Sequence, residues 1–218
     1  MVQELDIELV NNQQQRQPCV LVLDASYSMQ GTRIEQLNAG LKIFEQNIKD
    51  DDIAAERVQT LIIKCGGTAE VVSDWTDAEN FDPPNLLAVG GTPLGEAVKL
   101  ARDEIEKRKV EYRNAGVVYL RPWVFIISDG MPTDDYWEKE ANDLLNDERQ
   151  NKLTTFSVAV DDGDVDILSK FSQRSVVHMK GIDFSKMFVW LSKSMKMASR
   201  KVDDSETTNL PPVDWSSV

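Results

Sequence analysis

The sequence predicts an α/β fold: a doubly wound, mostly parallel six-stranded sheet with helices on both faces and one short antiparallel edge strand. Two observations predict the elements. Apolar runs rich in β-branched residues, CVLVL and WVFII, are typical of strands covered on both faces. Other segments carry apolar residues at spacings of three and four, as amphipathic helices do. The alternation of the two patterns along the chain favours parallel strands joined by helices.

The first half of the chain supplies three strands and one helix. A strand over 19–23 ends at Asp24, and the apolar spacing that follows predicts a helix over 34–50. Two further apolar runs, 58–64 and 70–73, flank a pair of glycines and are close enough to form a hairpin. That hairpin makes 70–73 the antiparallel edge strand.

The second half continues the alternation. Thr92 and Pro93 open a helix, with threonine at the N-cap and proline at the first helical position. A strand over 123–127 ends at Ser128-Asp129-Gly130. The remaining predicted elements are helices over 137–149, 165–171 and 184–198 and strands over 155–160 and 176–177.

Length and composition indicate one domain. The 218 residues suffice for a single α/β core, which we expect over 17–199, between an N-terminal extension (1–16) and an acidic tail (200–218) that includes Trp215. No stretch is apolar enough for a membrane span, and the N-terminus lacks a signal-peptide pattern. Cys19 and Cys65 fall in apolar strands and suit reduced thiols. These features predict a cytoplasmic protein.

Net charge restricts the partners. A formal charge of −13 repels phosphate backbones and anionic membrane surfaces, so neither nucleic acid nor a membrane is an expected partner. Acidic surfaces favour cations and basic partners, although the charge alone is also consistent with a role in solubility.

Oxygen-bearing side chains follow two of the predicted parallel strands. Asp24, Ser26 and Ser28 alternate after the first strand, Thr92 opens a helix, and Asp129 ends the 123–127 strand. Ligands of open α/β sheets bind outside the carboxyl ends of the strands. Two carboxylates and three hydroxyls are hard donors that suit Mg²⁺, with Mn²⁺ or Ca²⁺ as alternatives. Taken singly, these residues are also common helix caps and strand ends.

Together the three motifs carry a resemblance. The Asp-x-Ser-x-Ser run at Asp24, the threonine of Gly90-Gly91-Thr92-Pro93, and Ser128-Asp129-Gly130 resemble the metal-ion-dependent adhesion site of von Willebrand factor type A (VWA) domains, which have a Rossmann-like fold. The phrases PCVLVLD, GGTPLGEA and SDGMPTDD look closest to bacterial tellurium-resistance (TerY-like) members. Tyr27 departs from the family pattern, in which glycine is common at that position.

The resemblance implies a function. The two serines and Thr92 would coordinate the ion directly, one or both aspartates would act largely through water, and a partner's Asp or Glu would take the remaining position. It implies a protein-binding module, not an enzyme, with no catalytic residues. The TerY-like phrases imply a bacterial stress response, alongside a kinase and a phosphatase. Tyr27 beside the ion is expected to alter the choice of partner.

The competing interpretation is a magnesium-dependent phosphatase of the haloacid-dehalogenase type, with Asp24 as nucleophile. That chemistry usually needs a second aspartate two residues later, where this chain has Ser26.

Three other signals are read as structural. The acidic run at 161–166 lacks the glycine and glutamate of a calcium loop, Asp134-Asp135 is expected to cap the helix near Trp137, and the single histidine, His178, supports neither a zinc site nor a triad.

Overall fold

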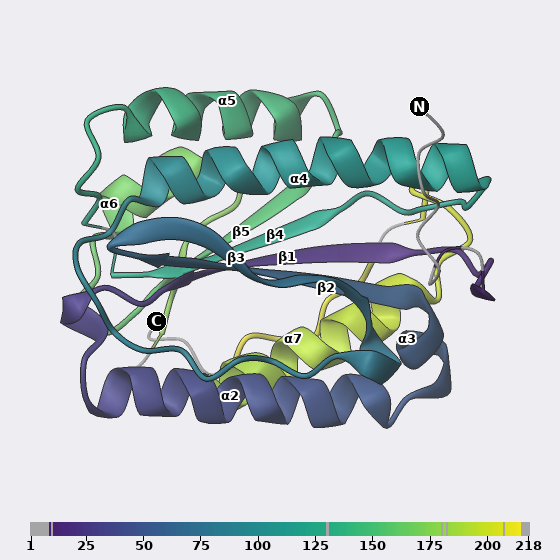
Figure 1. Ribbon diagram of the computed structural model, residues 1–218, viewed down its shortest axis with the longest axis horizontal. Helices are drawn as coiled ribbons and strands as arrows, with labels where there is room; N and C mark the ends of the chain where they lie inside the picture. The colour runs from purple at the N-terminus through teal and green to yellow at the C-terminus, as the bar shows by residue number, and fades with distance from the viewer. Residues whose placement is uncertain are drawn as a thin grey trace.

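Six strands form one sheet in the order β3-β2-β1-β4-β5-β6 (Figure 1). The computed structural model describes residues 9, 11–129, 131–179, 181, 183–206 and 208–214. All neighbouring strands are parallel except β2 and β3, which are antiparallel. The fold predicted from the sequence is confirmed. The strands are β1 Gln17–Asp24, β2 Val58–Gly66, β3 Thr68–Asp77, β4 Trp123–Ser128, β5 Thr154–Ala159 and β6 Val177–His178.

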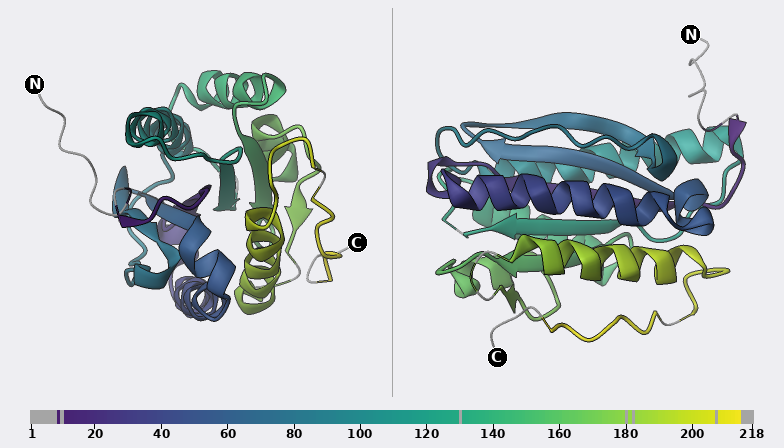
Figure 2. Two further views of the ribbon diagram at one scale, coloured as in Figure 1. Left: turned by 90° about the vertical axis from the view of Figure 1, so that its right-hand side faces the viewer. Right: turned by 90° about the horizontal axis from the view of Figure 1, so that it is seen from below.

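Helices cover both faces of the sheet (Figures 1 and 2). Side chains alternate along β1, so that Leu21 and Leu23 pack in one core with α2 and α7, whereas Val20 and Val22 pack in a second core with α4. The helices are α2 Thr32–Lys49, α3 Asp52–Arg57, α4 Leu94–Ala115, α5 Trp137–Arg149, α6 Val165–Leu168 and α7 Phe184–Ser199, with short 3₁₀ turns η1 Tyr27–Met29, η2 Ala78–Asn80 and η3 Ser169–Phe171.

Several local details of the structure differ from the sequence expectations. The edge strand β3 has ten residues, whereas the sequence predicted 70–73. The prediction was too short because the ends of β3 are polar and the apolar run marks only its middle. The short helix α3 was not expected. Thr92 is not the N-cap of α4, which is Pro93, and no cap comes from that residue's side chain. Instead the Asp134 carboxylate accepts hydrogen bonds from the main-chain N–H groups of Gly95 (3.2 Å) and Glu96 (3.0 Å).

Asp134 therefore caps a different helix from the one predicted. The loop after β4 carries it to the N-terminus of α4, where free N–H groups attract a carboxylate. The N-cap position of α5 is Tyr136, which makes no side-chain cap. The acidic run at 161–166 does begin a helix as predicted, because the Asp164 side chain accepts from the N–H of Ile167 at 2.9 Å.

Described residues on either side of 17–199 contact the domain. Leu9 and Arg16 are buried, and the Arg16 guanidinium pairs with Asp77 at 3.3 Å. Residues 208–214 run back beside α7, whereas Trp215 lies outside the described residues. Both cysteines are free and buried, and burial raises the pKa of each thiol. No helix in the described part of the chain is long and apolar enough to cross a membrane.

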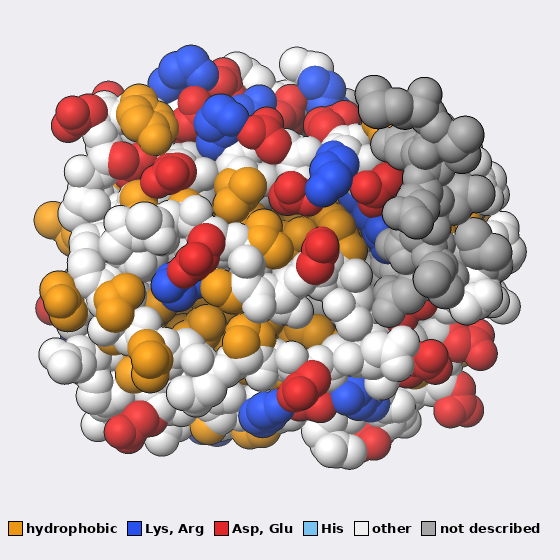
Figure 3. Space-filling view, in the orientation of Figure 1, with side chains coloured by type: hydrophobic (Ala, Val, Ile, Leu, Met, Phe, Trp, Pro, Cys, Tyr) orange, Lys and Arg blue, Asp and Glu red, His pale blue; other side chains and the backbone are white. Residues whose placement is uncertain are grey.

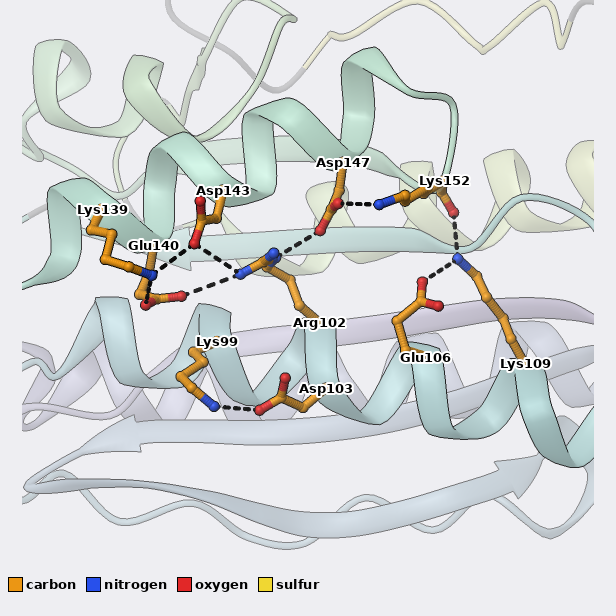
Figure 4. Close-up of polar contacts among 10 residues, drawn as sticks. All are labelled: Lys99, Arg102, Asp103, Glu106, Lys109, Lys139, Glu140, Asp143, Asp147 and Lys152. Carbon is orange, nitrogen blue, oxygen red and sulfur yellow. Dashed lines mark hydrogen bonds and ion pairs between the residues drawn. The ribbon is translucent and has the colours of Figure 1, made fainter.

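A ladder of ion pairs joins α4 to α5 on the outer surface (Figure 4). Arg102 lies at its centre, with its Nε 2.8 Å from Asp147 and its Nη1 3.2 Å from Glu140. Acidic and basic side chains are interspersed over both helices along the top of Figure 3. Burial raises the pKa of Asp147, but hydrogen bonds from Arg102 and Lys152 outweigh it and lower that pKa overall. The ladder is expected to hold the two helices together.

We expect Arg102→Met to lower the free energy of unfolding by about 1–3 kcal/mol, because it leaves the largely buried carboxylates of Glu140 and Asp147 without this partner. Urea unfolding at neutral pH measures the loss. A lowered carboxyl pKa stabilises the fold above its unfolded value and ceases to do so in acid, so the difference between variant and wild type should shrink as the pH falls through the Asp147 pKa. The control is Lys99→Met in the exposed Lys99–Asp103 pair, which should change little; equal losses from both variants would contradict the role of Arg102.

Candidate metal centre

Asp24 lies at the end of β1, in the centre of the sheet. Its side chain is buried, and both carboxylate oxygens are fixed. One accepts from the N–H of Ser26 at 2.9 Å, and the other accepts from the hydroxyl of Ser128 at 2.6 Å. The turn that follows, residues 25–28, is called the serine turn. It brings the hydroxyl oxygens of Ser26 and Ser28 within 2.8 Å of each other. Three of the predicted oxygens therefore share one small region at the carboxyl edge.

Thr92 reaches the same edge through the loop before α4. The N–H of Tyr27 donates to the Gly90 carbonyl at 2.9 Å, and the N–H of Val89 donates to the Ala25 carbonyl at 2.8 Å. Thr92 itself is buried, and its carbonyl accepts from the N–H groups of Leu94 and Thr133, both at 2.8 Å. Main-chain bonds thus hold this loop against the serine turn and against the loop after β4.

Asp129 follows β4, directly after the serine that binds Asp24. It is 8% exposed, and its carbonyl accepts from the N–H of Asp164 at 2.7 Å. Gly130 lies outside the described residues. The pKa of Asp24 is raised, first by burial and further by the negative charge of Asp129, although bonds from Ser128 and Ser26 act in the opposite direction. A bound cation would offset the cost of holding these two carboxylates ionised close together.

Glycines allow the loops to approach closely. A Cβ added to Gly66, at the end of β2, would lie 2.3 Å from the carbonyl oxygen of Ala25. A Cβ on Gly90 would lie 2.4 Å from the Cα of Gly67, and Gly90 also has a left-handed φ of 61°. A larger residue at Gly66 would displace the main chain at Ala25, and a larger residue at Gly90 would displace the turn between β2 and β3.

Two residues that sequence reasoning did not single out position the site. Ser128 was quoted only as part of a motif, yet its hydroxyl holds Asp24. Arg33, at the start of α2, donates to the Ser28 carbonyl at 2.9 Å and pairs with Asp161 at 2.6 Å and Asp162 at 3.3 Å. It ties the serine turn to the loop after β5. No pattern in the sequence indicated this bridge, because its partners lie 128 and 129 residues away.

The donor set fits a hard cation. The structure gathers Asp24, Ser26, Ser28, Thr92 and Asp129 at one edge, although it gives no direct contact between the last two and the others. Within the described residues, no three His, Cys, Asp or Glu side chains form a group able to hold a metal ion. A cation bound by these five residues would take most of its protein ligands from hydroxyls. Oxygen donors of this kind suit Mg²⁺ or Mn²⁺ and not softer metals.

The chain is an α/β domain with a doubly wound sheet, and its oxygen donors lie at the carboxyl edge, where open α/β sheets generally bind ligands. A sequence model of the von Willebrand factor type A domain matches residues 19–131, which is more than half of the chain. The chain belongs to the von Willebrand factor type A family. A comparison with curated protein sequences finds no match.

Solved structures show the same fold. The pilus adhesin SpaC of Lactobacillus rhamnosus GG is similar with a TM-score of 0.67 at 13% identity, over 86% of this chain and 32% of that one. A von Willebrand factor type A protein of Catenulispora acidiphila gives 0.62 at 14%, over 84% and 43%. Manganese-loaded TRAP protein of Plasmodium vivax gives 0.58 at 12%, over 82% and 73%. At these identities the likeness is one of fold. The chain spans only 32% of the length of SpaC and 43% of that of the Catenulispora acidiphila protein.

Proposed function

We propose that this chain is a metal-dependent protein-binding module, in which Asp24, Ser26, Ser28, Thr92 and Asp129 hold one Mg²⁺ and a partner's Asp or Glu completes the ion's shell. The observation that carries the proposal is the geometry of the Asp24 turn: a buried carboxylate held at both oxygens beside two hydroxyls that meet at 2.8 Å. The manganese-loaded TRAP protein, which shares the fold, gives additional support.

The chemistry of the donors supports binding of a carboxylate. Hydroxyl ligands leave the charge of the ion uncompensated, so the ion attracts an incoming Asp or Glu strongly. Tyr27 is 65% exposed on the turn between the two serines, where it adds contact area for the partner. We assign no catalytic residue. The phosphatase alternative is not favoured, because the chain has the family's fold and Ser26 stands where that chemistry needs an acid.

We also propose a cytoplasmic role in a bacterial tellurium-resistance or stress-response system, with a kinase and a phosphatase of the same system as candidate partners. The sequence phrases around Asp24, Thr92 and Asp129 support the assignment by resemblance. The buried free thiols of Cys19 and Cys65 are consistent with a reducing compartment.

A peptide-binding experiment tests the proposal. Full-length protein is titrated into short labelled peptides that carry one Asp or Glu, in Mg²⁺ and again in chelator. We expect binding in Mg²⁺ only, and at least about tenfold weaker binding for Asp24→Ala and for peptides with Asn or Gln at the acidic position. Binding that survives both chelator and Asp24→Ala would overturn the proposal.

The raised pKa of Asp24 predicts how Mg²⁺ affinity depends on pH. Burial favours the protonated carboxyl of Asp24 in the folded protein, so at a pH above the Asp24 pKa the ionised carboxylate lowers the stability of the metal-free fold. At a pH below that pKa, Mg²⁺ has to displace a proton from Asp24 in order to bind. The Mg²⁺ affinity should therefore fall about tenfold per pH unit below that pKa, and the fall should begin above the range of an ordinary aspartate, about 3.9. Calorimetric titrations across a pH series measure it. The Asp166→Asn variant, which removes an exposed carboxylate from α6, should follow the wild type; a flat profile for both would contradict the assignment of Asp24.

A further inference from the structure

A groove lies at the end of the sheet opposite the metal centre, beneath the chain that follows α7. Residues 201–206 form bends and a turn, and residues 208–214 run back beside α7 (Figure 2). We call residues 201–206 and 208–210 the strap. The groove between the strap and the body of the domain has a volume of about 260 Å³. It is lined on the body side by Gln17, Arg121, Trp123, Thr154, Phe156 and Arg174.

A few separated contacts hold the strap. Both carboxylate oxygens of Asp204 accept from the main-chain N–H of Arg121, at 3.0 and 3.1 Å. The side chain of Gln15 donates to the Val202 carbonyl at 2.8 Å, and Leu210 packs against the main core. Residues 202–206 are otherwise exposed. A segment with so few buried contacts opens locally at low cost in free energy.

The body side of the groove differs in charge from the protein as a whole. The chain carries a net charge of −13, yet the residues that line the body side are neutral or cationic. The carboxylates that line the groove, Asp204 and Glu206, both belong to the strap. The Nε atom of Arg121 is buried and has no hydrogen-bond partner among the described residues. Arg174 lies 3.9 Å from Glu148 and leaves 48% of its side chain exposed.

Aromatic rings supply an apolar floor. The ring centroids of Trp123 and Phe156 are 5.0 Å apart, and the Arg174 guanidinium lies 5.2 Å over the Phe156 ring. The main chain of β5 beside this floor is already satisfied, because the N–H of Thr155 donates to the Glu148 carboxylate at 3.0 Å and its carbonyl accepts from the Ser172 hydroxyl at 2.9 Å. Recognition in the groove therefore comes from side chains and not from an added strand. The aromatic floor and the cations together favour a peptide with carboxylates and an aliphatic side chain.

We propose that this groove is a second docking surface for an acidic segment of a partner protein, and that the strap occupies it until the partner displaces it. The strap itself shows the chemistry that fits, since it places a carboxylate on the Arg121 N–H and a leucine against the core. The surface does not depend on the metal centre, so the two proposals stand separately.

The test uses a labelled synthetic peptide with the sequence of residues 201–214, followed by fluorescence anisotropy in chelator. The receptors are full-length wild type, Asp204→Asn, and Asp204→Asn combined with Leu210→Ala. Because Asp204 is exposed, its Asn variant should remain folded, and melting curves check both variants. We expect the variants to bind the peptide at least about tenfold more tightly than wild type, because their own strap competes less well.

Two controls identify the surface. A peptide with Asn, Asn and Gln in place of Asp203, Asp204 and Glu206 should bind at least about tenfold more weakly, as should a receptor that also carries Arg174→Glu. Asp24→Asn added to the receptor should change nothing. Equal affinity of wild type and variants, or of acidic and neutral peptides, would overturn the proposal. A dimer that forms in place of peptide binding would overturn the choice of occupant and assign the groove to a second copy of this chain.

Discussion

Asp24→Asn is expected to abolish divalent cation binding while the fold remains intact. Asparagine keeps an oxygen that can accept from the N–H of Ser26, and the substitution removes a buried charge beside Asp129. The apo variant should therefore melt at the wild-type temperature or above it. The Mg²⁺ and Mn²⁺ affinities should fall at least about 100-fold, because one of the two carboxylates that attract the ion is lost.

Titration calorimetry and melting with and without metal measure both effects. The matched control is Asp166→Asn, which removes an exposed carboxylate from α6 and should leave the metal affinity unchanged. A variant at Asp24 that still gained stability from Mg²⁺ would place the ion elsewhere.

Gly66→Ala is expected to have the second-largest effect, although residue 66 carries no ligand. The added Cβ would lie 2.3 Å from the carbonyl oxygen of Ala25, so the main chain between Asp24 and Ser26 has to move. That carbonyl also accepts from the N–H of Val89, which joins the serine turn to the loop of Thr92. We expect a loss of about 1–3 kcal/mol in the free energy of unfolding and at least a tenfold loss of Mg²⁺ affinity.

Gly116→Ala separates these two losses. Gly116 ends α4 with a left-handed φ of 71° and open space around it, so alanine there strains the main chain without touching the site. This control should lose about 1 kcal/mol of stability and keep its metal affinity. If Gly66→Ala bound Mg²⁺ as the wild type does, the glycine contact would have no part in shaping the site.

Much of the fold could be predicted from local pattern. The buried strands β1 and β4 are continuous apolar runs, and the helix predicted over 137–149 is observed as α5 Trp137–Arg149. Patterns failed where polar residues end an element, as in β3, or where a partner distant in the chain decides the contact. Asp134 caps α4 and not α5 because the loop after β4 folds across α4, which no spacing near Asp134 reveals.

In the candidate site, too, local pattern identified the residues, whereas contacts between distant parts of the chain could not be predicted. Its five residues could be named because each follows a strand or lies just before a helix at the carboxyl edge, and the resemblance supplied their order. Arg33 and the glycine contact at Gly66 depend on tertiary approach between loops, so sequence alone did not indicate them. The strap over the groove likewise reads as an unpatterned tail until the fold brings Asp204 to Arg121.

The most direct test of the central claim is anomalous scattering from crystals of the full chain grown with Mn²⁺. We expect one peak at the carboxyl edge, within about 2.5 Å of the hydroxyl oxygens of Ser26 and Ser28. In crystals of Asp24→Asn this peak should be absent. A peak at Asp161 and Asp162 instead, or no ordered ion beside the two serines at saturating Mn²⁺, would contradict that claim.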